Sequence, residues 1–532
     1  MLLIITQCKK EMNIKYFTQK PDFSVAKVCN RLRSKISAIR FMFKTFAFRI
    51  FIVALVLRLI PVILARGLGI GLDDMFQYDM LARSLAGGHG FRWYAEADLN
   101  QLASFVDFDL TSVKDYDPAL GIPTSFRAPL YPTFLAIVYF FSGTGFSRFF
   151  AARIAQAIFL GAPLAPLTYW VAQRLFPLPS TLITERGRLK ENMARMAAWI
   201  VAAYPMLLVY PLGLGTENPF FILLLASFLF LLISIEKPTT INLLLSGFFL
   251  GLTTLTRSVI LPFAGLAILW IWFANKQKRG AILVAIAFAL TISPWIVRNS
   301  LLHHKLTGVE TSMGYNLYLG YHPNGNGSFV FGPSLDLLPI LDDAERDKVG
   351  TQKAVEFIKA QPERFIPLAF NRLGFFFGLE KRVLMYFYGN DIIGYIPLPW
   401  LLTISAILLL PFVFISVLAA LGLSLLRWKP EHILLGLLLV SYILPHVFIL
   451  SEDRFHLALI PYIAILASQV WVNGFMPLHV HWNESRIGKI MVVFALCAAI
   501  LLLTNWGLEL NRDADKIAQL LSLTGNQSYF PY

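Results

Sequence analysis

Apolar runs long enough to cross a lipid bilayer recur along the chain, and short clusters of Lys and Arg separate them. A membrane-crossing helix needs about 20 predominantly apolar residues, and from about residue 50 onward the runs approach or meet that length repeatedly. Hydrophobic residues make up 57% of the chain and charged residues 15%, well beyond the apolar share of ordinary soluble domains. The sequence therefore predicts an all-α polytopic membrane protein.

The basic clusters predict on which side of the membrane each loop lies. The net charge of +14 falls mainly between apolar runs, as the positive-inside rule expects, so we interpret it as topology and not as a nucleic-acid footprint. Residues 128–143 are short and begin with two prolines, which favours a juxtamembrane helix over a crossing. The remaining runs predict about eleven crossings, at approximately 50–66, 149–176, 196–213, 219–235, 241–256, 259–275, 280–297, 396–426, 432–451, 457–474 and 490–506.

These crossings divide the chain into parts with different environments. The notable polar residues then share the outer side of the membrane, which is where chemistry can be assembled. The predicted parts are a basic cytoplasmic segment (1–49), a transmembrane module (50–297) with its first outer loop (67–148), an outer loop region (298–395), C-terminal transmembrane helices (396–506) and an outer tail (507–532).

Several function classes lack their usual sequence signals. The three cysteines are scattered, and the nine histidines show no metal-ligand spacing, so neither a disulfide framework nor a metal site is predicted. There is no phosphate-binding Walker loop, no GxSxG nucleophile elbow and no Rossmann fingerprint. ATP-driven transport and serine hydrolysis therefore lose their usual support.

Three aspartates cluster in GLDDMFQYDMLARSLAGGHGF, residues 71–91, just after the first apolar run. We expect a helix over 73–86 with Asp74 and Tyr78 on one face, lying along the membrane surface. Capping of a helix start explains Asp73 or Asp74 equally well. In a catalytic reading, a carboxylate there acts as a general base, or holds a divalent cation against a phosphate. Asp79 is expected to be a solvated helix residue.

Arginines at predicted outer helix ends suit a phosphate or pyrophosphate group. Arg257, Arg298 and Arg454 occupy such positions, and Glu217 lies in a short loop between two apolar runs. Interfacial anchoring explains each arginine taken singly, but three beside acids favour binding of an anionic lipid head group. Arg58, in the middle of the first crossing, needs a partner there or must reach the interface.

An ordered set of short motifs resembles the membrane-embedded glycosyltransferases of the GT-C fold, which include protein O-mannosyltransferases, aminoarabinose transferases and bacterial proteins similar to dolichyl-phosphate-mannose-protein mannosyltransferases. The first motif reads D-x-x-x-Y-x-x-x-A-R-x-L from Asp74, followed by GHGF. The later ones are RAPLYPTFLA (127–136), TENPF (216–220), LTRSVIL (255–261), SPWIVRNS (293–300), GYNLYLGYHPNGNG (314–327) and EDRFHLALIPYIAILA (452–467).

The resemblance implies transfer of a sugar from a polyprenyl-phosphate donor to a glycolipid, polysaccharide or protein acceptor, with inversion. It implies that Asp74 is the catalytic base, with Asp73 as a second candidate. It implies a site on the extracytoplasmic face of a bacterial inner membrane, with the N-terminus cytoplasmic. The substrate-binding residues that it implies are Tyr78, Arg127, Glu217, Arg257, Arg298 and Arg454.

One departure from the family pattern limits what the resemblance implies about the donor. Arg127 and Ala128 stand where aminoarabinose transferases have an acid and a lysine, which argues against an aminoarabinose donor. No cofactor is predicted, and a divalent cation stays open. The alternative is a transporter or flippase for a lipid-linked or anionic substrate, although such proteins tend to place polar groups on broken helices near the membrane centre, in repeats that this chain lacks.

Overall fold

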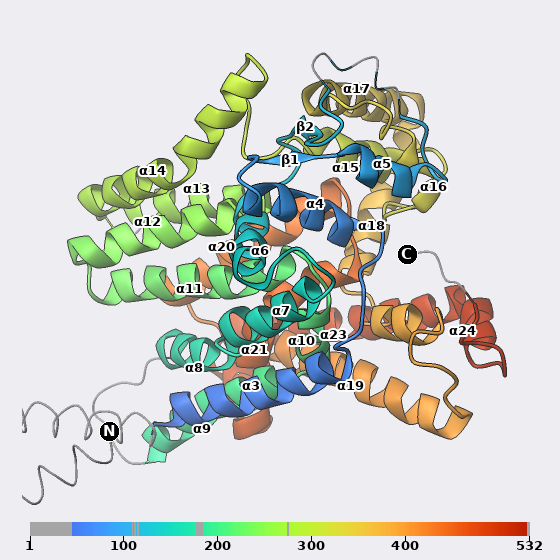
Figure 1. Cartoon of the computed structure of the whole chain (residues 1–532). Coiled ribbons are helices and arrows are strands. Elements are labelled where there is room, and N and C mark those ends of the chain that lie inside the picture. The colour runs from blue at the N-terminus through green and yellow to red at the C-terminus, as the bar shows by residue number, and fades with distance from the viewer. Residues whose placement is uncertain are drawn as a thin grey trace, which may run out of the picture.

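Helices account for nearly all of the regular structure in the computed structural model (Figure 1), which describes residues 45–528 apart from 109, 111–112, 114–115, 177–184 and 274–275. Most of the predicted cytoplasmic segment 1–49 therefore lies outside the described residues. Within the described part, eight helical runs are long and apolar enough to cross a membrane. The prediction of an all-α polytopic membrane protein is confirmed.

The eight runs contain the longest helices of the protein. They are α3 (Phe46–Leu64), Arg148–Leu175 (α7, Arg148–Ala155; the π-helix η2, Gln156–Gly161; α8, Leu164–Leu175), α11 (Glu217–Glu236), α14 (Lys278–Leu302), α19 (Leu398–Leu423), α20 (Pro430–Phe448), Asp453–Asn473 (the 3-10 helix η7, Asp453–Leu459; α21, Ile460–Asn473) and α23 (Arg486–Arg512).

A ninth candidate span, Arg188–Leu212, is broken at residue 204, toward its C-terminal end. The helix α9 (Glu185–Ala203) is followed by α10 (Pro205–Val209) and the 3-10 helix η3 (Tyr210–Leu212), and the two parts are bent by 52°. Pro205 explains the break, because proline lacks the amide hydrogen that would continue the helix. The nine candidates coincide with nine of the predicted crossings.

The other two predicted crossings, 241–256 and 259–275, fall on shorter apolar helices. These are α12 (Thr240–Thr254) and the run Ser258–Phe273, formed by η4 (Ser258–Ile260) and α13 (Leu261–Phe273). Length and composition therefore support eight or nine spans, fewer than the eleven predicted. The apolar pattern continues through both segments, but α12 ends at Thr254 and the next helical run begins at Ser258. Neither run therefore reaches the usual spanning length.

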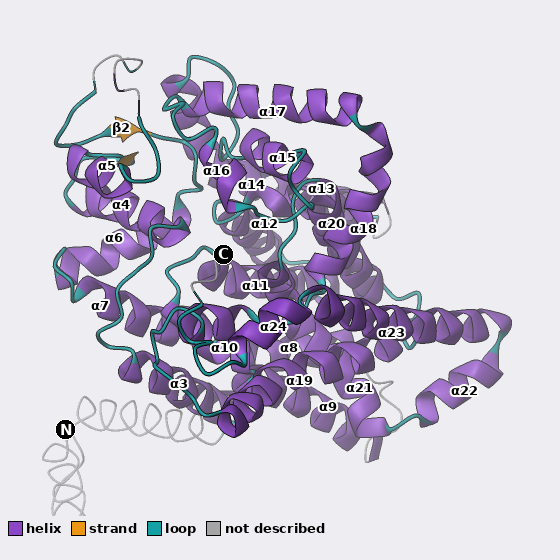
Figure 2. Ribbon diagram, turned by 90° about the vertical axis from the view of Figure 1, so that its right-hand side faces the viewer, coloured by secondary structure: helices purple, strands orange, loops and turns teal. Residues whose placement is uncertain are grey.

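Shorter elements from two distant parts of the chain cover one end of the long helices (Figures 1 and 2). We call this layer the cap. The region 298–395, predicted as an outer loop, is largely helical. The cap consists of α4 (Asp74–Ala86), the two-stranded ribbon β1 (Arg92–Trp93) with β2 (Ile122–Pro123), α5 (Glu96–Leu102), α15 (Met313–Tyr321), α16 (Phe331–Leu335) and α17 (Asp343–Ala360).

Five further elements lie between the cap and the long helices or near the C-terminus. The segment 128–143 forms α6 (Leu130–Ser142), which is too short to span and packs against α4 through Tyr78, Ala82, Tyr131 and Leu135. From α17 the chain returns through α18 (Phe365–Phe376) and the π-helix η6 (Leu384–Tyr388). Near the C-terminus, α22 (Met476–Glu484) precedes α23, and α24 (Ala514–Leu520) follows it.

The run Asp453–Asn473 is the most enclosed of the candidate spans, with 89% of its apolar window buried. It packs against α9 and α19, and its side chains belong to the largest hydrophobic cluster of the protein. A residue at the start of this run is therefore held by the core itself. Arg454 occupies that position.

Asp79 is buried, and the expectation that it is solvated is wrong. Its carboxylate accepts hydrogen bonds from Arg83 Nε at 2.8 Å, from Arg148 Nε and Nη2 at 2.7 and 2.9 Å, and from the Tyr139 hydroxyl at 3.0 Å. Arg148 and Tyr139 lie more than 55 residues further along the chain, so the local sequence around α4 gives no sign of this pairing. The cluster joins α4 to α6 and α7.

Arg58, also buried, satisfies the expectation of an internal partner. Its guanidinium donates hydrogen bonds to the carbonyl oxygens of Ala54, Val201 and Ala202 at 3.0 to 3.2 Å. Because these acceptors are backbone groups of α3 and α9, Arg58 joins two long helices and has a structural role.

Replacing Asp79 with Ala leaves the Arg83 and Arg148 guanidinium groups without their shared carboxylate. Removing one partner of a buried ion pair costs about 3–5 kcal/mol, so we expect a large drop in the melting temperature of the purified protein. Asp107→Ala is the matched control, because Asp107 is exposed. Equal melting temperatures for the two variants would contradict a buried ion-pair cluster at Asp79.

Candidate functional site

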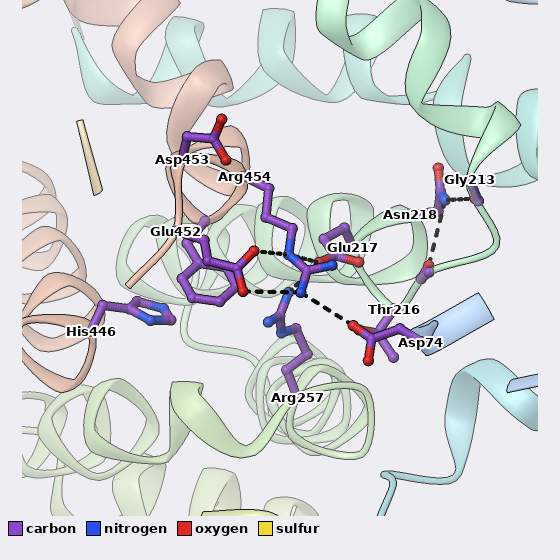
Figure 3. A network of polar contacts seen from close by, with 12 residues as sticks. Asp74, Gly213, Thr216, Glu217, Asn218, Arg257, His446, Glu452, Asp453 and Arg454 are labelled. Atoms are coloured by element: carbon purple, nitrogen blue, oxygen red, sulfur yellow. Dashed lines mark hydrogen bonds and ion pairs between the residues drawn. The ribbon is translucent and has the colours of Figure 1, made fainter. Parts of the chain in front are cut away.

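Asp73 and Asp74 begin the predicted cap helix and have different roles in its geometry. Asp73 is the N-cap of α4, and its Oδ1 accepts a hydrogen bond from the Met75 amide at 2.8 Å. Asp74 is the first helical residue, and its carboxylate pairs with Arg127 and with Arg454. Figure 3 shows the contact with Arg454. The capping interpretation thus accounts for Asp73 and leaves Asp74 for other contacts.

Arg127 forms one side of the Asp74 environment. Its Nη2 donates a hydrogen bond to Asp74 Oδ1, and its Nε and Nη2 lie 2.8 and 2.6 Å from Gln77 Oε1. The guanidinium carbon is 5.2 Å from the centre of the Tyr78 ring, a cation–π contact. The Tyr78 hydroxyl lies 3.4 Å from Thr216 Oγ1, so the same face of α4 also reaches the start of α11.

Arg454 is surrounded by three carboxylates from three parts of the chain (Figure 3). Its Nη2 lies 3.2 Å from Asp74 Oδ2, and its Nε lies 3.0 Å from Glu452 Oε2 and 3.6 Å from Glu217 Oε1. One guanidinium therefore contacts the start of α4, the start of α11 and the turn before η7. No other arginine in the described residues forms ion pairs with three acids.

Glu217 is shared between Arg454 and Arg257. Arg257 Nη1 lies 3.0 Å from Glu217 Oε1, and its guanidinium carbon is 5.0 Å from the Phe455 ring centre. Arg257 follows α12 with an extended backbone and precedes η4, so it lies where two short apolar helices meet. Glu217 itself is buried at the N-terminus of α11, where a carboxylate is favoured by the helix dipole.

These contacts form one continuous ion-pair network, which we define as Asp74, Arg127, Glu217, Arg257, Glu452 and Arg454. Five of the eight predicted site residues are members of it, and two more, Asp73 and Tyr78, lie next to members. Arg298 contacts other groups: its Nη1 donates to the Thr124 carbonyl at 2.6 Å and its Nη2 to the Phe91 carbonyl at 3.3 Å. None of the described contacts of Arg298 involves a member of the network.

The sequence prediction of site residues omits one member of the network, Glu452, and a further partner of that residue, Arg382. Glu452 pairs with Arg454 and also with Arg382, whose Nη2 lies 2.6 Å from Glu452 Oε2. Nothing in the local sequence except the adjacent basic residues Lys381 and Arg382 indicates a role for this arginine, because its partner Glu452 is 70 residues away. Glu452 stands out only as part of the charged run EDR before an apolar stretch.

The two adjacent aspartates have opposite electrostatic environments. Burial alone would raise the pKa of Asp74, but the charges of Arg127 and Arg454 outweigh it and hold that pKa below its usual range. Burial and the neighbouring Asp74 carboxylate raise the pKa of Asp73. Asp74 is therefore ionised and bound by arginines at neutral pH.

No group of three or more His, Cys, Asp or Glu side chains suited to a metal ion occurs in the described residues. The carboxylates of the network instead face guanidinium groups. What the arrangement can do chemically is to hold an anion between arginines and to present a carboxylate beside it.

Fold and site together define the class: an all-α polytopic membrane protein with an ion-pair network at the ends of its long helices. No family model and no curated protein matches the chain. Among solved structures, the chain is similar to the crystal structure of ArnT from Cupriavidus metallidurans bound to undecaprenyl phosphate, which it matches at 12% identity with a TM-score of 0.38. That match covers 90% of this chain and 74% of ArnT. A likeness at this level carries no inference about activity.

The low pKa of Asp74 predicts a pH-dependent contribution to stability. Folding favours its ionised form, so its stabilisation is present above the unfolded pKa of about 3.9 and is lost as the pH falls toward the lower folded pKa. Wild type should therefore melt at a higher temperature than Asp74→Asn at pH 7, and the difference should shrink below about pH 4. Melting curves of both proteins between pH 7 and pH 3 measure it. A difference that grows on acidification would contradict the assigned pairing.

Proposed function

We propose that this protein is a membrane glycosyltransferase that transfers a sugar from a polyprenyl-phosphate donor to an acceptor, with inversion at the anomeric carbon. The observation that carries the proposal is the environment of Asp74. This carboxylate lies at the start of the cap helix α4, next to the ends of long apolar helices, and it forms ion pairs with two arginines. The order of motifs along the sequence supports the same reading.

The arginines suit the phosphate of such a donor. Arg127, Arg257 and Arg454 each form an ion pair with a carboxylate. A phosphate entering among them competes with those carboxylates and gains charge-assisted hydrogen bonds of the same kind. As the bond to the sugar breaks, the phosphate gains a negative charge, and guanidinium groups already in place stabilise that charge.

Asp74 is proposed as the base, and its pairing explains how the substrate activates it. While Arg127 and Arg454 contact it, the low pKa makes Asp74 a weak base. When the donor phosphate takes up these arginines, the Asp74 pKa rises and the carboxylate can accept a proton. Asp73, whose pKa burial raises, is the second candidate, although its side chain caps α4.

The bond changes balance without a cofactor. An acceptor hydroxyl gives its proton to Asp74 while its oxygen attacks the anomeric carbon from the face opposite the phosphate. The bond between that carbon and the phosphate oxygen breaks, and the electron pair leaves with polyprenyl phosphate. Only one carboxylate is then required, in contrast to the paired acids of soluble glycosidases.

The position of the network within the fold supports a lipid-linked substrate. Glu217 begins the span Glu217–Glu236, and Arg454 is the second residue of the span Asp453–Asn473. A lipid phosphate lies at the same depth, where the apolar span ends. Charges at helix ends also disfavour the transporter or flippase alternative, in which polar groups tend to lie near the membrane centre. We assign this face to the extracytoplasmic side of a bacterial inner membrane.

Asp74→Asn should reduce sugar transfer from a polyprenyl-phosphate donor by about 10²- to 10⁴-fold, the typical contribution of a general base. Transfer is measured in membranes or detergent with a radiolabelled lipid-linked sugar. Asp73→Asn is the matched variant, because asparagine caps a helix as well as aspartate does. Loss of transfer only in Asp73→Asn would move the base to Asp73, and retention in both would refute the assignment.

The assigned orientation predicts opposite accessibility of two exposed positions in a variant without native cysteines. Ala119→Cys, in the loop between β1 and β2, should react with a membrane-impermeant maleimide in intact cells. Lys237→Cys, between α11 and α12, should react only after the membrane is opened. The reverse pattern would put the network on the cytoplasmic side and exclude an extracytoplasmic donor site.

A further inference from the structure

A loop outside all of the predicted motifs brings a fourth arginine to the ion-pair network. Residues 377–383 connect α18 to η6, and Arg382 lies near the end of this loop. Its Nη2 is 2.6 Å from Glu452 Oε2, and its Nε is 3.4 Å from Asp453 Oδ1. Arg382 therefore shares Glu452 with Arg454, and its position depends on how the loop is held.

Glu380 fixes one side of this loop. Its side chain is 1% exposed, and its Oε1 accepts a hydrogen bond from the Tyr204 hydroxyl at 2.5 Å and lies 3.0 Å from His456 Nε2. His456 Nδ1 lies 2.7 Å from the Phe376 carbonyl, so this nitrogen carries a hydrogen. His456 is buried and stacks on Phe412 at 4.1 Å, so the hydrophobic core holds its ring.

The spacing along the chain makes this contact relevant to the network. Glu380 is two residues before Arg382, and His456 is two residues after Arg454. The Glu380–His456 contact therefore joins the two segments that carry the arginines on either side of Glu452. Tyr204, at the break between α9 and α10, attaches the same carboxyl group to the core.

The helix α23 holds the other side of the loop. Trp506 Nε1 donates to the Phe377 carbonyl at 2.7 Å, and Glu509 Oε2 accepts from the Leu379 amide at 2.9 Å. Lys381 Nζ lies 2.6 Å from Glu509 Oε1. With α23 on one side and Glu380 on the other, residues 377, 379, 380 and 381 each have a contact that holds the loop before Arg382.

We infer that Glu380 is a positioning residue of the candidate site, and that it acts by holding Arg382 in place to bind the donor phosphate together with Arg454. This inference rests on the proposed function and adds Arg382 and Glu380 to it. A shift of about 1 Å in a positioning group costs an enzyme substantial activity. The loop can make such a shift when Glu380 is truncated, because Arg382 is 29% exposed and has room to move.

The Glu380 carboxyl does not need its charge for this role. Burial raises its pKa, against the opposing effects of His456 and Tyr204, and its Oε2 has no hydrogen-bond partner among the described residues. Tyr204 and His456 both contact Oε1, so a glutamine can satisfy both through its amide nitrogen, which donates one hydrogen to His456 Nε2 and the other to the Tyr204 hydroxyl oxygen. Glu380→Gln should therefore preserve the loop, whereas Glu380→Ala removes both contacts.

The test compares donor KM, kcat and the affinity for polyprenyl phosphate in purified variants. Glu380→Ala and Arg382→Ala should each raise donor KM and weaken polyprenyl phosphate binding by roughly 10- to 100-fold, as expected for loss of a charged hydrogen bond. Their kcat should change less than their KM. Glu380→Gln should behave as wild type, and the double Ala variant should be no worse than Arg382→Ala, because the two residues act as one unit. Arg195→Ala, which breaks an exposed helix pair with Glu191, is the control.

Three outcomes would overturn the inference in distinguishable ways. Wild-type KM and affinity in Glu380→Ala, with active wild-type enzyme, would refute the positioning role and leave the proposed function standing. Additive effects in the double variant would show that Glu380 acts independently of Arg382. A wild-type protein that neither transfers sugar nor binds polyprenyl phosphate would refute the proposed function, and the inference with it.

Discussion

The interaction on which the site depends is the contact of one guanidinium, that of Arg454, with three carboxylates. Arg454 lies at the start of the most enclosed candidate span, where an uncompensated charge would be costly. Its compensation comes from Asp74 in the cap, Glu217 at the start of α11 and Glu452 in its own turn. Segments up to 380 residues apart are thereby brought to one point. The contact between the cap and the long helices at this point places a carboxylate of the cap against the buried guanidinium of Arg454.

The network has a property that isolated ion pairs lack, because each of its acids contacts two arginines. Asp74 contacts both Arg127 and Arg454. Glu217 contacts both Arg257 and Arg454, and Glu452 contacts both Arg382 and Arg454. An anion that takes up both Arg127 and Arg454 therefore frees Asp74, while Glu217 keeps Arg257 and Glu452 keeps Arg382 as a partner. Under the proposed function, the donor phosphate is that anion and Asp74 is the carboxylate released, so the base becomes effective only when the donor is bound.

Local signals in the sequence predicted much of this site, and distant pairings account for what they missed. The helix after Asp73, its cap and the arginines at helix ends follow from short motifs and from capping chemistry. The burial of Asp79 does not, because Arg148 and Tyr139 are remote in sequence. Arg298 shares the helix-end signal of Arg257 and Arg454, but it donates to backbone carbonyls of the cap. The sequence prediction likewise rests on the lengths of apolar runs and not on the lengths of helices. It therefore gives eleven crossings, whereas eight or nine candidate spans in the described residues are long enough.

Under the proposed function, the guanidinium of Arg454 receives a lipid-linked phosphate. The most direct measurement is the affinity of the purified protein for polyprenyl phosphate and for the matching polyprenol, in wild type and in Arg454→Gln. We predict that wild type binds polyprenyl phosphate much more tightly than polyprenol, and that Arg454→Gln loses this preference while it still folds. Equal affinity of wild type for the two lipids, or an unchanged preference in Arg454→Gln, would contradict the account.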